Sequence, residues 1–534
     1  MATSTVLNFL VGGTNKGKYP AVCGSELSVN MYKCTNGKNV FMESMPGIKM
    51  LAQVGGKCRG VWVSTRGLKS EGSTEDMFVA MGNRLYRVLP DGTCTAILTL
   101  AANGRRVTFA EAGGPRAILL ICDGSSLYAY FLEEGTVRQV AMPSAVEGDG
   151  HTVRPTFVTV VNGVIVVNDQ DSGYAYYSIP YPLSADTREV FDLDPNGGVQ
   201  YEADNVTVKK KPVDAWQYAF LDDYGVQQFM NSESNSDSIN GLASIGNALY
   251  LFGPKSVEIY TYAGEEYATW SRQYFSATGE FGLEAPNSLC CVGRSIYFVS
   301  TGRQFGKCVM RVTGTNFERV SEDWLDERII GNTSSAYGFG YGVNEHSFYV
   351  LQVPEIKQTW CFDGATNEWH ERRSRSYLSA TEMRWRVGGV AYFRSRFYAF
   401  TEDGMVALFG PDYWYEDYKD GTKSVICRHR QGPVFTSDLR PFVIEDLTVE
   451  CNVGTAPSYN DRAKVLMECS KDGGMTWGNI RSASFGLTGQ YSHRVRFLNL
   501  GRNRLCVIRI TFSEPMDFVL TNCSIRAGAT GSQI

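Results

Sequence analysis

Seven segments of the chain repeat one order of polar and apolar positions: a turn, then a short polar stretch, then an apolar run. The clear copies are GNRLYRV, DGSSLYAY, GNALYLF and GRSIYFV, and the looser copies are NGVIVVN, EHSFYVL and RSRFYAF. In chain order, their centres are Tyr86, Tyr128, Val166, Tyr250, Tyr297, Tyr349 and Tyr398. The steps between these centres are 42, 38, 84, 47, 52 and 49 residues. A period of roughly 40–50 residues built from short strands predicts a β-propeller with one four-stranded blade per repeat.

The strands within these repeats carry the pattern of a buried sheet. The stretch TFVTVVNGVIVV (Thr156–Val167) is apolar at nearly every position and does not alternate with polar residues. A strand has this pattern when both of its faces are covered, as in a blade stacked between two others. We therefore predict an all-β chain with a β-propeller of roughly six to eight blades. The alternative is a β-sandwich of unrelated hairpins.

The rhythm of the strands changes after about Gly432. Strand-like runs separated by turn residues follow, among them FVIEDLTVECNV, AKVLMECS, HRVRFLNL, LCVIRITF and FVLTNCSIRA. They predict an appended C-terminal antiparallel β domain. The expected organisation is an extended segment joining the ring at 1–55, the propeller at 56–430 with a polar insertion near 169–240, and the sandwich-like domain at 431–534. The step of 84 residues spans either this insertion or one unrecognised copy.

Helical signals are few. The best is SEDWLDERII (Ser321–Ile330), in which Ser321 is the expected N-cap and acidic residues occupy the first turn. The chain is therefore expected to be almost free of helix.

Composition and charge narrow the function. The chain has 534 residues, of which 43% are hydrophobic and 20% charged, so it is not a disordered protein. Its 55 glycines favour a structure rich in turns. With 51 Lys and Arg against 56 Asp and Glu, the net charge is −5, which gives no basic excess for wrapping nucleic acid. DNA close to this protein is expected to pass by without specific binding.

No metal, cofactor or membrane site is predicted. The N-terminal stretch MATSTVLNFLVGGTNKGKYP lacks the charged region and the apolar length of a signal peptide, and no run is long enough to span a membrane. Cysteines within apolar runs, such as Cys290, Cys291 and Cys506, are expected to be reduced core thiols in a protein folded in the cytoplasm. No cysteine pair has C-x-x-C spacing, and the five histidines are scattered.

One short motif suggests a fold rather than a reaction. Ser470, Asp472, Gly474, Thr476 and Trp477 lie in SKDGGMTW, which has the spacing of the Asp box of sialidase propellers. Glycine permits a positive φ at a tight turn, the hydroxyls and the carboxylate can bind the loop backbone, and the tryptophan can cover the turn. Each of these roles is structural, so we interpret the motif as a structural turn.

The alternative function is an Asp-box propeller that binds or cleaves carbohydrate in the manner of a sialidase. Such an enzyme needs an arginine clamp on a carboxylate, a tyrosine nucleophile with an acidic partner, and an acid/base carboxylate. Only one Asp box fits the pattern, and the chain has neither a G-x-S-x-G elbow nor a G-K-[ST] phosphate loop. We predict no catalytic residues and expect that the chain is not an enzyme.

Basic runs and an aromatic stretch are candidate contacts with other subunits. Charge runs, including RHR at Arg428–Arg430, are usually solvated faces, and Tyr and Trp are enriched at protein interfaces. The candidate interface residues are Arg372, Arg373, Arg375, Trp414 and Tyr415.

Three stretches together resemble a known family, the tail hub or nozzle proteins of short-tailed phages, also called packaged-DNA stabilisation proteins. The stretches are ELSVNMYKCTNGKNVFMESMPGIKMLAQVGGKCRGVWV; FERVSEDWLDERI with EHSFYVLQVPEIKQTWCFDGATNEWHERRS; and LMECSKDGGMTWGNIR with YSHRVRFLNLGRNRLCVIRITFSEP. They recur in order between residues 26 and 515, and the likeness is weakest at 169–240. The Asp box belongs to the C-terminal part of this pattern.

The resemblance implies a structural virion protein without enzymatic activity. It implies a homo-oligomeric ring, a hexamer, below the portal and adaptor proteins of the tail. Such a ring closes the channel to retain packaged DNA, conducts the DNA during ejection, and docks tail fibres, spikes or a needle. The protein would be made and assembled in the cytoplasm of the host bacterium and would reside in the virion tail.

Overall fold

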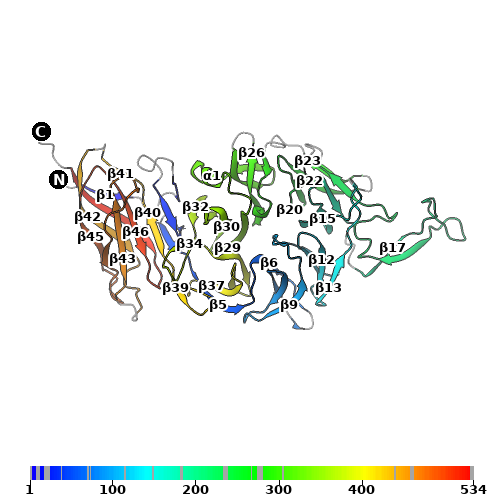
Figure 1. Cartoon of the computed structure of the whole chain (residues 1–534), viewed down its shortest axis with the longest axis horizontal. Coiled ribbons are helices and arrows are strands. Elements are labelled where there is room, and N and C mark those ends of the chain that lie inside the picture. Colours follow the sequence, from blue (N-terminus) through cyan, green and yellow to red (C-terminus); the bar gives the residue numbers. More distant parts are fainter. Residues whose placement is uncertain are drawn as a thin grey trace.

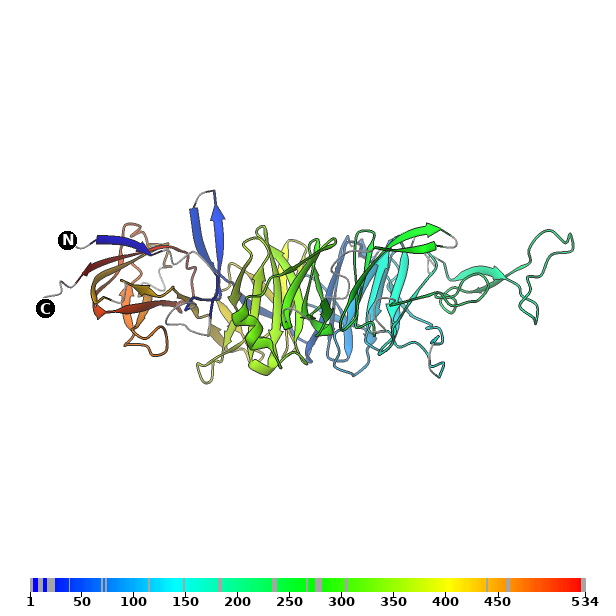
Figure 2. The same cartoon turned by 90° about the horizontal axis from the view of Figure 1, so that it is seen from above.

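Three parts follow one another along the long axis of the molecule: a β-sandwich, a ring of blades seen face-on, and an extended arm (Figure 1). Figure 2 shows the same order from above, with both ends of the chain at the sandwich. The structure is a computed structural model. It describes residues 3–7, 13–16, 25–37, 39–68, 71–72, 74–113, 116–146, 149–180, 185–232, 238–265, 268–273, 281–302, 306–437, 440–457 and 462–529.

Seven antiparallel blades make up the ring in the described part of the chain. The first is β6 (Cys58–Ser64), β7 (Asp76–Met81), β8 (Arg84–Val88) and β9 (Cys94–Thr99). The second is β10 (Thr108–Ala112), β11 (Ile118–Cys122), β12 (Leu127–Phe131) and β13 (Thr136–Val140). The third is β14 (Val158–Val161), β15 (Val164–Asn168), β16 (Tyr174–Tyr177) and β19 (Phe229–Asn231). The fourth is β20 (Gly241–Ile245), β21 (Ala248–Phe252), β22 (Val257–Glu265) and β23 (Ala268–Gln273).

The remaining blades complete the circle. The fifth is β25 (Cys290–Val292), β26 (Ser295–Gly302), β27 (Gly306–Thr313) and β28 (Asn316–Arg319), with β24 (Phe281–Leu283) also paired to β26. The sixth is β29 (Tyr337–Val343), β30 (His346–Val353), β31 (Gln358–Asp363) and β32 (Glu368–Glu371). The seventh is β35 (Val387–Phe393), β36 (Arg396–Thr401), β37 (Met405–Gly410) and β5 (Gly47–Gln53). Its inner strand β35 packs against β6, so the ring is closed.

Each of the seven sequence repeats lies in a different blade. Tyr86 and Tyr128 lie in third strands, β8 and β12, whereas the other five repeat centres lie in second strands. The two positions look alike in sequence because both follow a tight turn, although Tyr86 and Tyr128 are half-buried and the other five centres are buried. The step of 84 residues corresponds to an insertion after β16, and no blade is missing there.

The strands of neighbouring blades come close together. All residues of β7 and β15 are buried, as their non-alternating sequences predict. In the glycine-rich stretch YGFGYG, a Cβ atom at Gly340 would lie 2.2 Å from Val292 Cγ2, and one at Gly338 would lie 2.6 Å from the carbonyl oxygen of Ser288. These glycines therefore let the fifth and sixth blades approach each other.

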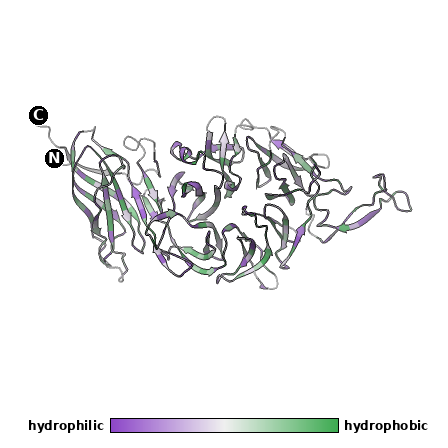
Figure 3. Ribbon diagram, viewed as in Figure 1, coloured by the Kyte–Doolittle hydropathy of each residue, from purple (hydrophilic) through white to green (hydrophobic). Residues whose placement is uncertain are grey.

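The C-terminal part is a two-sheet sandwich. One sheet contains β3 (Met31–Asn36), β4 (Asn39–Ser44), β47 (Leu520–Ala529), β42 (Phe442–Cys451) and β45 (Val495–Asn503), with β1 (Thr3–Leu7) paired to β47. The other contains β40 (Arg428–Gln431), β46 (Leu505–Phe512), β43 (Lys464–Ser470) and β44 (Arg481–Ser484), with β41 (Phe435–Thr436) paired to β46. Ile444, Leu447, Val465, Ile508 and Phe512 are buried in one core between them. Figure 3 shows hydrophobic residues along the strands of both the ring and the sandwich.

The sandwich and the propeller share one continuous sheet. The short strand β2 (Leu27–Val29) pairs in parallel with β32 of the sixth blade and antiparallel with β40 of the sandwich. Backbone hydrogen bonds therefore run from β29 at the ring axis to β44 at the far side of the sandwich. The N-terminal residues are divided between the two parts: β1, β3 and β4 belong to the sandwich, β2 bridges, and β5 completes the seventh blade.

The polar insertion forms the arm, which comprises residues 185–228. It contains the hairpin of β17 (Thr187–Phe191) and β18 (Lys210–Asp214) and projects from the ring on the side opposite the sandwich (Figure 1). The blade strands β16 and β19 flank it. Because β16 and β19 pair with each other, the arm is inserted between the last two strands of the third blade.

Two short hairpins, one α-helix and the short 3-10 helices Pro286–Ser288 and Pro354–Ile356 complete the described part of the fold. The hairpins are β33 (Arg373–Arg375) with β34 (Glu382–Arg384), and β38 (Tyr415–Asp417) with β39 (Lys423–Val425). The helix α1 (Asp323–Ile329) has Glu322 as its N-cap, so the prediction of Ser321 as the cap is wrong. The Ser321 hydroxyl instead accepts a hydrogen bond from the backbone N–H of Val309 in β27.

Within the described residues, no helix has the length and apolar character needed to cross a membrane. The described cysteines carry no disulfide, and Cys58, Cys122 and Cys361 are buried in the blades.

Candidate functional site

Charged side chains are concentrated where the propeller meets the sandwich. We call Lys16, Glu371, Arg373, Glu382, Cys427 and His429 the junction cluster. Glu371, at the end of β32, is only 2% exposed. Both of its oxygens accept hydrogen bonds from Arg373, each at 2.7 Å, and Lys16 Nζ lies 3.4 Å from Oε2. Burial alone would raise the pKa of Glu371, but Arg373 and Lys16 hold it below its usual range.

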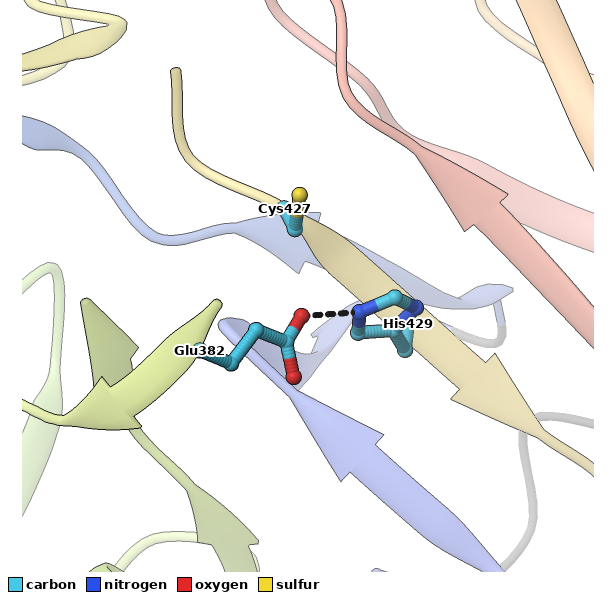
Figure 4. A group of neighbouring side chains, drawn as sticks. All are labelled: Glu382, Cys427 and His429. Atoms are coloured by element: carbon cyan, nitrogen blue, oxygen red, sulfur yellow. Dashed lines mark hydrogen bonds and ion pairs between the residues drawn. The ribbon is translucent and has the colours of Figure 1, made fainter. Parts of the chain in front are cut away.

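A second carboxylate of the junction cluster links three elements (Figure 4). Glu382 on β34 reaches His429 on β40, with 2.5 Å between Oε1 and Nε2. Its other oxygen accepts a hydrogen bond from Arg373 Nη1 at 2.5 Å. Burial acts to raise the pKa of Glu382, but the hydrogen bonds and charges of His429 and Arg373 outweigh it and lower the pKa to about 2. The other His429 nitrogen, Nδ1, lies 2.9 Å from the Thr511 hydroxyl on β46.

Three members of the junction cluster are also potential metal ligands. One ligand atom each of Glu382, Cys427 and His429 lies within 4.8 Å of the others, and Zn²⁺ accepts such a donor set. The surroundings, however, are cationic, because Arg373 binds Glu382 and Arg375 Nη1 donates to Cys427 Sγ at 3.3 Å. Burial also raises the pKa of the Cys427 thiol, which disfavours the thiolate that a metal requires. The arrangement fits an ion-pair clamp better than a metal centre.

The strand β40 has two buried arginines on one face and the half-buried His429 on the other. Arg428 and Arg430 alternate with His429, so their side chains point to the opposite face, and both are 0% exposed. Arg428 Nη1 donates to the carbonyl oxygen of Glu514 at 3.0 Å, and its guanidinium lies 5.3 Å from the centre of the Trp414 ring. Burial lowers the pKa of Arg428 to about 10. The interpretation of this basic run as a solvated face is therefore wrong for the two arginines, because other side chains cover that face, such as the Trp414 and Phe512 rings near Arg428.

The candidate interface residues divide between the interior and the surface. Arg372 is 1% exposed, and its guanidinium packs 4.8 Å from the centre of the Trp385 ring and binds the Tyr341 hydroxyl. Its prediction as an interface residue is wrong, because successive residues of an extended chain point to opposite sides and Arg372 points inward.

The other four candidates keep some exposed surface. Arg373 and Arg375 are half-buried at the junction cluster, and Trp414 is half-buried against Arg428. Tyr415 is 38% exposed. An interface role for these four residues stays a prediction.

The residues of the Asp box form hydrogen bonds with one another in the turn that joins β43 to β44. The Ser470 hydroxyl donates to Asp472 Oδ1 at 2.7 Å and accepts from the Gly474 N–H at 2.8 Å. Asp472 accepts hydrogen bonds from the backbone N–H of Thr476 at 2.8 Å and from its hydroxyl at 2.5 Å, and these bonds lower its pKa to about 2. Trp477 packs against Arg509 of β46, 4.0 Å from ring centre to guanidinium. The box lies in the sandwich, outside the ring.

The central cavity of the ring has a volume of about 900 Å³ and is lined by the inner strands of the blades. Two arginines, Arg105 and Arg106, belong to its described lining. Arg106 Nη1 donates to the carbonyl oxygens of Cys58 and Gly388, at 3.3 and 3.1 Å, and its guanidinium lies 5.0 Å from the centre of the Tyr337 ring. These contacts tie Arg106 to the first and seventh blades, so it serves ring closure. The described lining does not supply a three-arginine clamp.

The sequence pattern could indicate the blades but not the junction cluster. Its members come from residues 16 to 429, and they meet only because β2 inserts between β32 and β40. The charged residues grouped in HERRSR and CRHR are a weak sequence signal for part of the junction cluster.

Likenesses to solved structures are at the level of general shape. Virginiamycin B lyase from Staphylococcus aureus is 10% identical, with 68% of this chain and 97% of that chain covered and a TM-score of 0.36. BamB from Moraxella catarrhalis is 11% identical, with 71% and 93% covered and a TM-score of 0.31. The extracellular domain of a hybrid two-component system from B. thetaiotaomicron is 11% identical, with 87% and 57% covered and a TM-score of 0.38. Likenesses this distant carry no argument about function. No curated protein sequence matches the chain.

Two family models match the sequence. The model described as bacteriophage P22 Gp10, beta-propeller, matches residues 220–404, and the model described as bacteriophage P22 Gp10, beta-sandwich, matches residues 428–528. Together they cover more than half of the 534 residues, in the order in which the structure places a propeller and a sandwich. The resemblance noted in the sequence is thereby confirmed. The chain belongs to the bacteriophage P22 Gp10 family of tail hub and packaged-DNA stabilisation proteins.

Proposed function

We propose that this protein is the subunit of a homo-oligomeric ring, a hexamer, in the tail of a short-tailed phage. The ring lies below the portal and adaptor proteins, closes the channel to retain packaged DNA, and conducts the DNA during ejection. Tail fibres, spikes or a needle dock on it. The subunits are made and assembled in the cytoplasm of the host bacterium, and the chain performs no catalysis.

The observation that carries this proposal is the match to the two bacteriophage P22 Gp10 family models, and the sheet from β29 to β44, which passes from blade to sandwich through the Val29–Glu371 pair, supports it. A wall that holds pressurised DNA must not bend at a domain boundary, and a backbone ladder across the boundary resists such bending. Close-packed protein interiors have low compressibility, so load on one part is passed to the other. Within each subunit, the ring of blades is completed by β5, a strand that precedes the first blade in the sequence and pairs with β37 of the seventh blade.

The junction cluster adds to this stiffness. The pair of Glu382 on β34 and His429 on β40 joins the propeller side to the sandwich, so separating the two parts would break it. Breaking a buried ion pair by removing one partner costs about 3–5 kcal/mol. The boundary is therefore held by paired charges as well as by the backbone ladder.

The charge of the chain also suits a conduit. Contacts between Lys or Arg and phosphates release counterions and dominate the affinity of proteins for DNA. With a net charge of −5, the chain carries no basic excess that would hold the phosphates it must release. We therefore expect DNA to pass through the channel without specific binding to the protein.

The test is a reconstitution with DNA-filled heads that carry portal and adaptor but lack this protein. We expect the purified full-length chain to restore DNA retention, measured as DNA protected from added nuclease, and to appear as a ring at the tail in electron micrographs. Equal DNA retention with and without the chain would contradict the proposal. So would hydrolysis of sialosides or host polysaccharide by the purified chain, which would favour the carbohydrate-active alternative.

A further inference from the structure

We propose that the arm of one subunit docks on the sandwich of a neighbouring copy of this chain. The docking surface on the sandwich consists of Lys471, Met475, Ile480, Arg481, Leu498 and Arg502, which we call the sandwich-end patch. This inference rests on the proposed ring and specifies which surfaces would join its subunits.

The far half of the arm exposes apolar side chains. Val206 is 79% exposed, Val226 56%, Tyr201 54% and Tyr224 51%. All residues from 201 to 207 are exposed. Burying apolar surface is worth about 25 cal/mol per Å², so such a projection gains most when a second surface covers it.

Hydrogen bonds within the arm hold its turns in place, which favours docking over random motion. Asp194, Asp204 and Asp222 each accept two backbone N–H hydrogen bonds from their own turns, all between 2.8 and 2.9 Å. Backbone bonds also tie the chain across the arm, such as that from Lys209 N–H to the carbonyl oxygen of Gln200 at 2.8 Å. A surface that is already ordered loses less conformational entropy when it binds.

The base of the arm is fixed in the ring. Trp216 is 2% exposed and meets the Phe131 ring of the second blade edge-on, with 4.8 Å between ring centres. The Arg116 guanidinium lies 3.6 Å from the centre of the Phe131 ring and binds Glu134 and Asp186, with Nη2–Oε2 and Nη1–Oδ1 distances of 2.6 and 2.9 Å. A force on the arm would therefore reach the blades.

Charge identifies the surface that the arm fits. Residues 185–228 contain nine Asp and Glu against four Lys and Arg, a net charge of −5 that equals the net charge of the whole chain. Residues 470–504 contain six Lys and Arg and one Asp, and that Asp472 is occupied by hydrogen bonds within its own loop. Complementary charge of this kind steers association and selects the partner.

The sandwich-end patch combines these cations with exposed apolar residues. Met475 is 73% exposed, Ile480 64% and Leu498 54%. Arg481 Nη1 donates to the carbonyl oxygen of Leu498 at 2.7 Å, which joins β44 to β45 on one surface. Lys471 Nζ donates to the carbonyl oxygen of Arg502 at 3.2 Å, which places both cations beside that surface.

The two surfaces lie at opposite ends of the molecule (Figures 1 and 2). One subunit therefore cannot bring its own arm to its own sandwich, whereas a row of identical subunits can satisfy both. Such a head-to-tail contact is heterologous, and it gives a closed ring when the rotation between subunits closes.

The experiment uses two variants of the full-length chain. One has substitutions on the arm, and the other has substitutions on the sandwich-end patch. The arm variant carries Glu202→Lys and Val206→Lys, and the patch variant carries Leu498→Asp and Arg502→Glu. We expect each variant alone to self-associate about tenfold or more weakly than wild type in light scattering. Mixed together, the two should form a dimer and nothing larger, because one working arm then meets one working patch. All four substituted side chains are exposed, so melting curves close to that of the wild type serve as the folding control.

A photo-activated cross-linker placed at position 206 gives an independent readout. We expect a cross-linked dimer of the chain, with the linked peptide within residues 470–504. A monomeric wild type at all concentrations, a mixture without dimer, or a cross-link to any other surface or protein would overturn the inference. DNA retention is not part of this readout, so failure of the proposed function and failure of the docking contact are distinguishable.

Discussion

The junction cluster and the arm are both connections, and they treat charge and apolar surface in opposite ways. In the junction cluster, the charged group Glu371 is buried and paired with Arg373. On the arm, apolar side chains such as Val206 and Tyr224 are exposed, and the charged groups lie beside them in water. A buried charge must be paired within the subunit, whereas an exposed apolar surface can be covered later by another molecule that binds to it. The junction is thus complete in one chain, and the arm is not.

The largest expected effect tests whether the base of the arm is part of the ring. Trp216→Ala removes a buried indole between the arm and the second blade, so we expect the free energy of unfolding to fall by about 3–5 kcal/mol. The measurement is urea denaturation followed by fluorescence and circular dichroism. Tyr201→Ala, on the exposed part of the same arm, is the matched control and should change little. Equal effects of the two variants would remove the distinction between base and tip.

The next effect tests the buried pairing at the junction cluster. Glu371→Ala leaves Lys16 and Arg373 without their shared carboxylate, although Arg373 keeps Glu382. We expect a loss of about 3 kcal/mol, at the lower end of the range for a broken buried pair.

Glu134→Ala is the control for this loss, because it also removes a carboxylate from an arginine but at a site where the Glu134 side chain is 44% exposed. It should cost less than about 1 kcal/mol. Comparable denaturation midpoints for the two variants would show that the junction is not better shielded than the surface.

Acid should weaken the pairing of Glu382 at the junction cluster. The pKa of Glu382 is lowered from 4.5 to about 2, so its pairing stabilises the fold fully above pH 4.5 and is lost as the pH falls towards 2. A shift of this size corresponds to at most about 3 kcal/mol. We expect the melting temperature of wild type to drop between pH 4.5 and 2, and that of Glu382→Gln to drop less over the same interval. Parallel curves would contradict the role of Glu382.

The smallest expected effect concerns the tip of the arm. Val206→Ser replaces an exposed apolar side chain with a polar one, so the stability of the monomer should stay within about 0.5 kcal/mol of wild type. Denaturation at low protein concentration, where subunits are separate, is the appropriate measurement. A clear loss of stability would mean that Val206 packs within its own subunit, and the contrast with the junction would disappear.

Much of the propeller could be predicted because its information is local. Each repeat carries a turn, a polar position and a buried strand within about ten residues, and these patterns depend on neighbours in the sequence. The Asp box is local for the same reason, since Ser470, Asp472 and Thr476 bind one another within one loop. The count of seven blades needed the structure, because the last blade takes β5 from a distant part of the chain.

The errors share one cause. Ser321, Arg372 and the run Arg428–Arg430 were judged by residue type, as a cap or as surface charges. In the structure Ser321 binds a strand of the fifth blade, Arg372 packs on Trp385, and aromatic rings lie near the buried Arg428. Burial of a polar side chain depends on what the fold places against it, and residue type alone does not carry that information.

By itself the sequence determined the all-β class, the repeated blades and the family. Turn residues and strand periodicity act over a few neighbours, so they can be recognised without coordinates. Only the tertiary structure decided that β2 joins the sixth blade to the sandwich, that the junction charges are buried in pairs, and that the arm exposes apolar side chains. Those features depend on contacts between residues hundreds of positions apart, whose free energies exist only once the chain has folded.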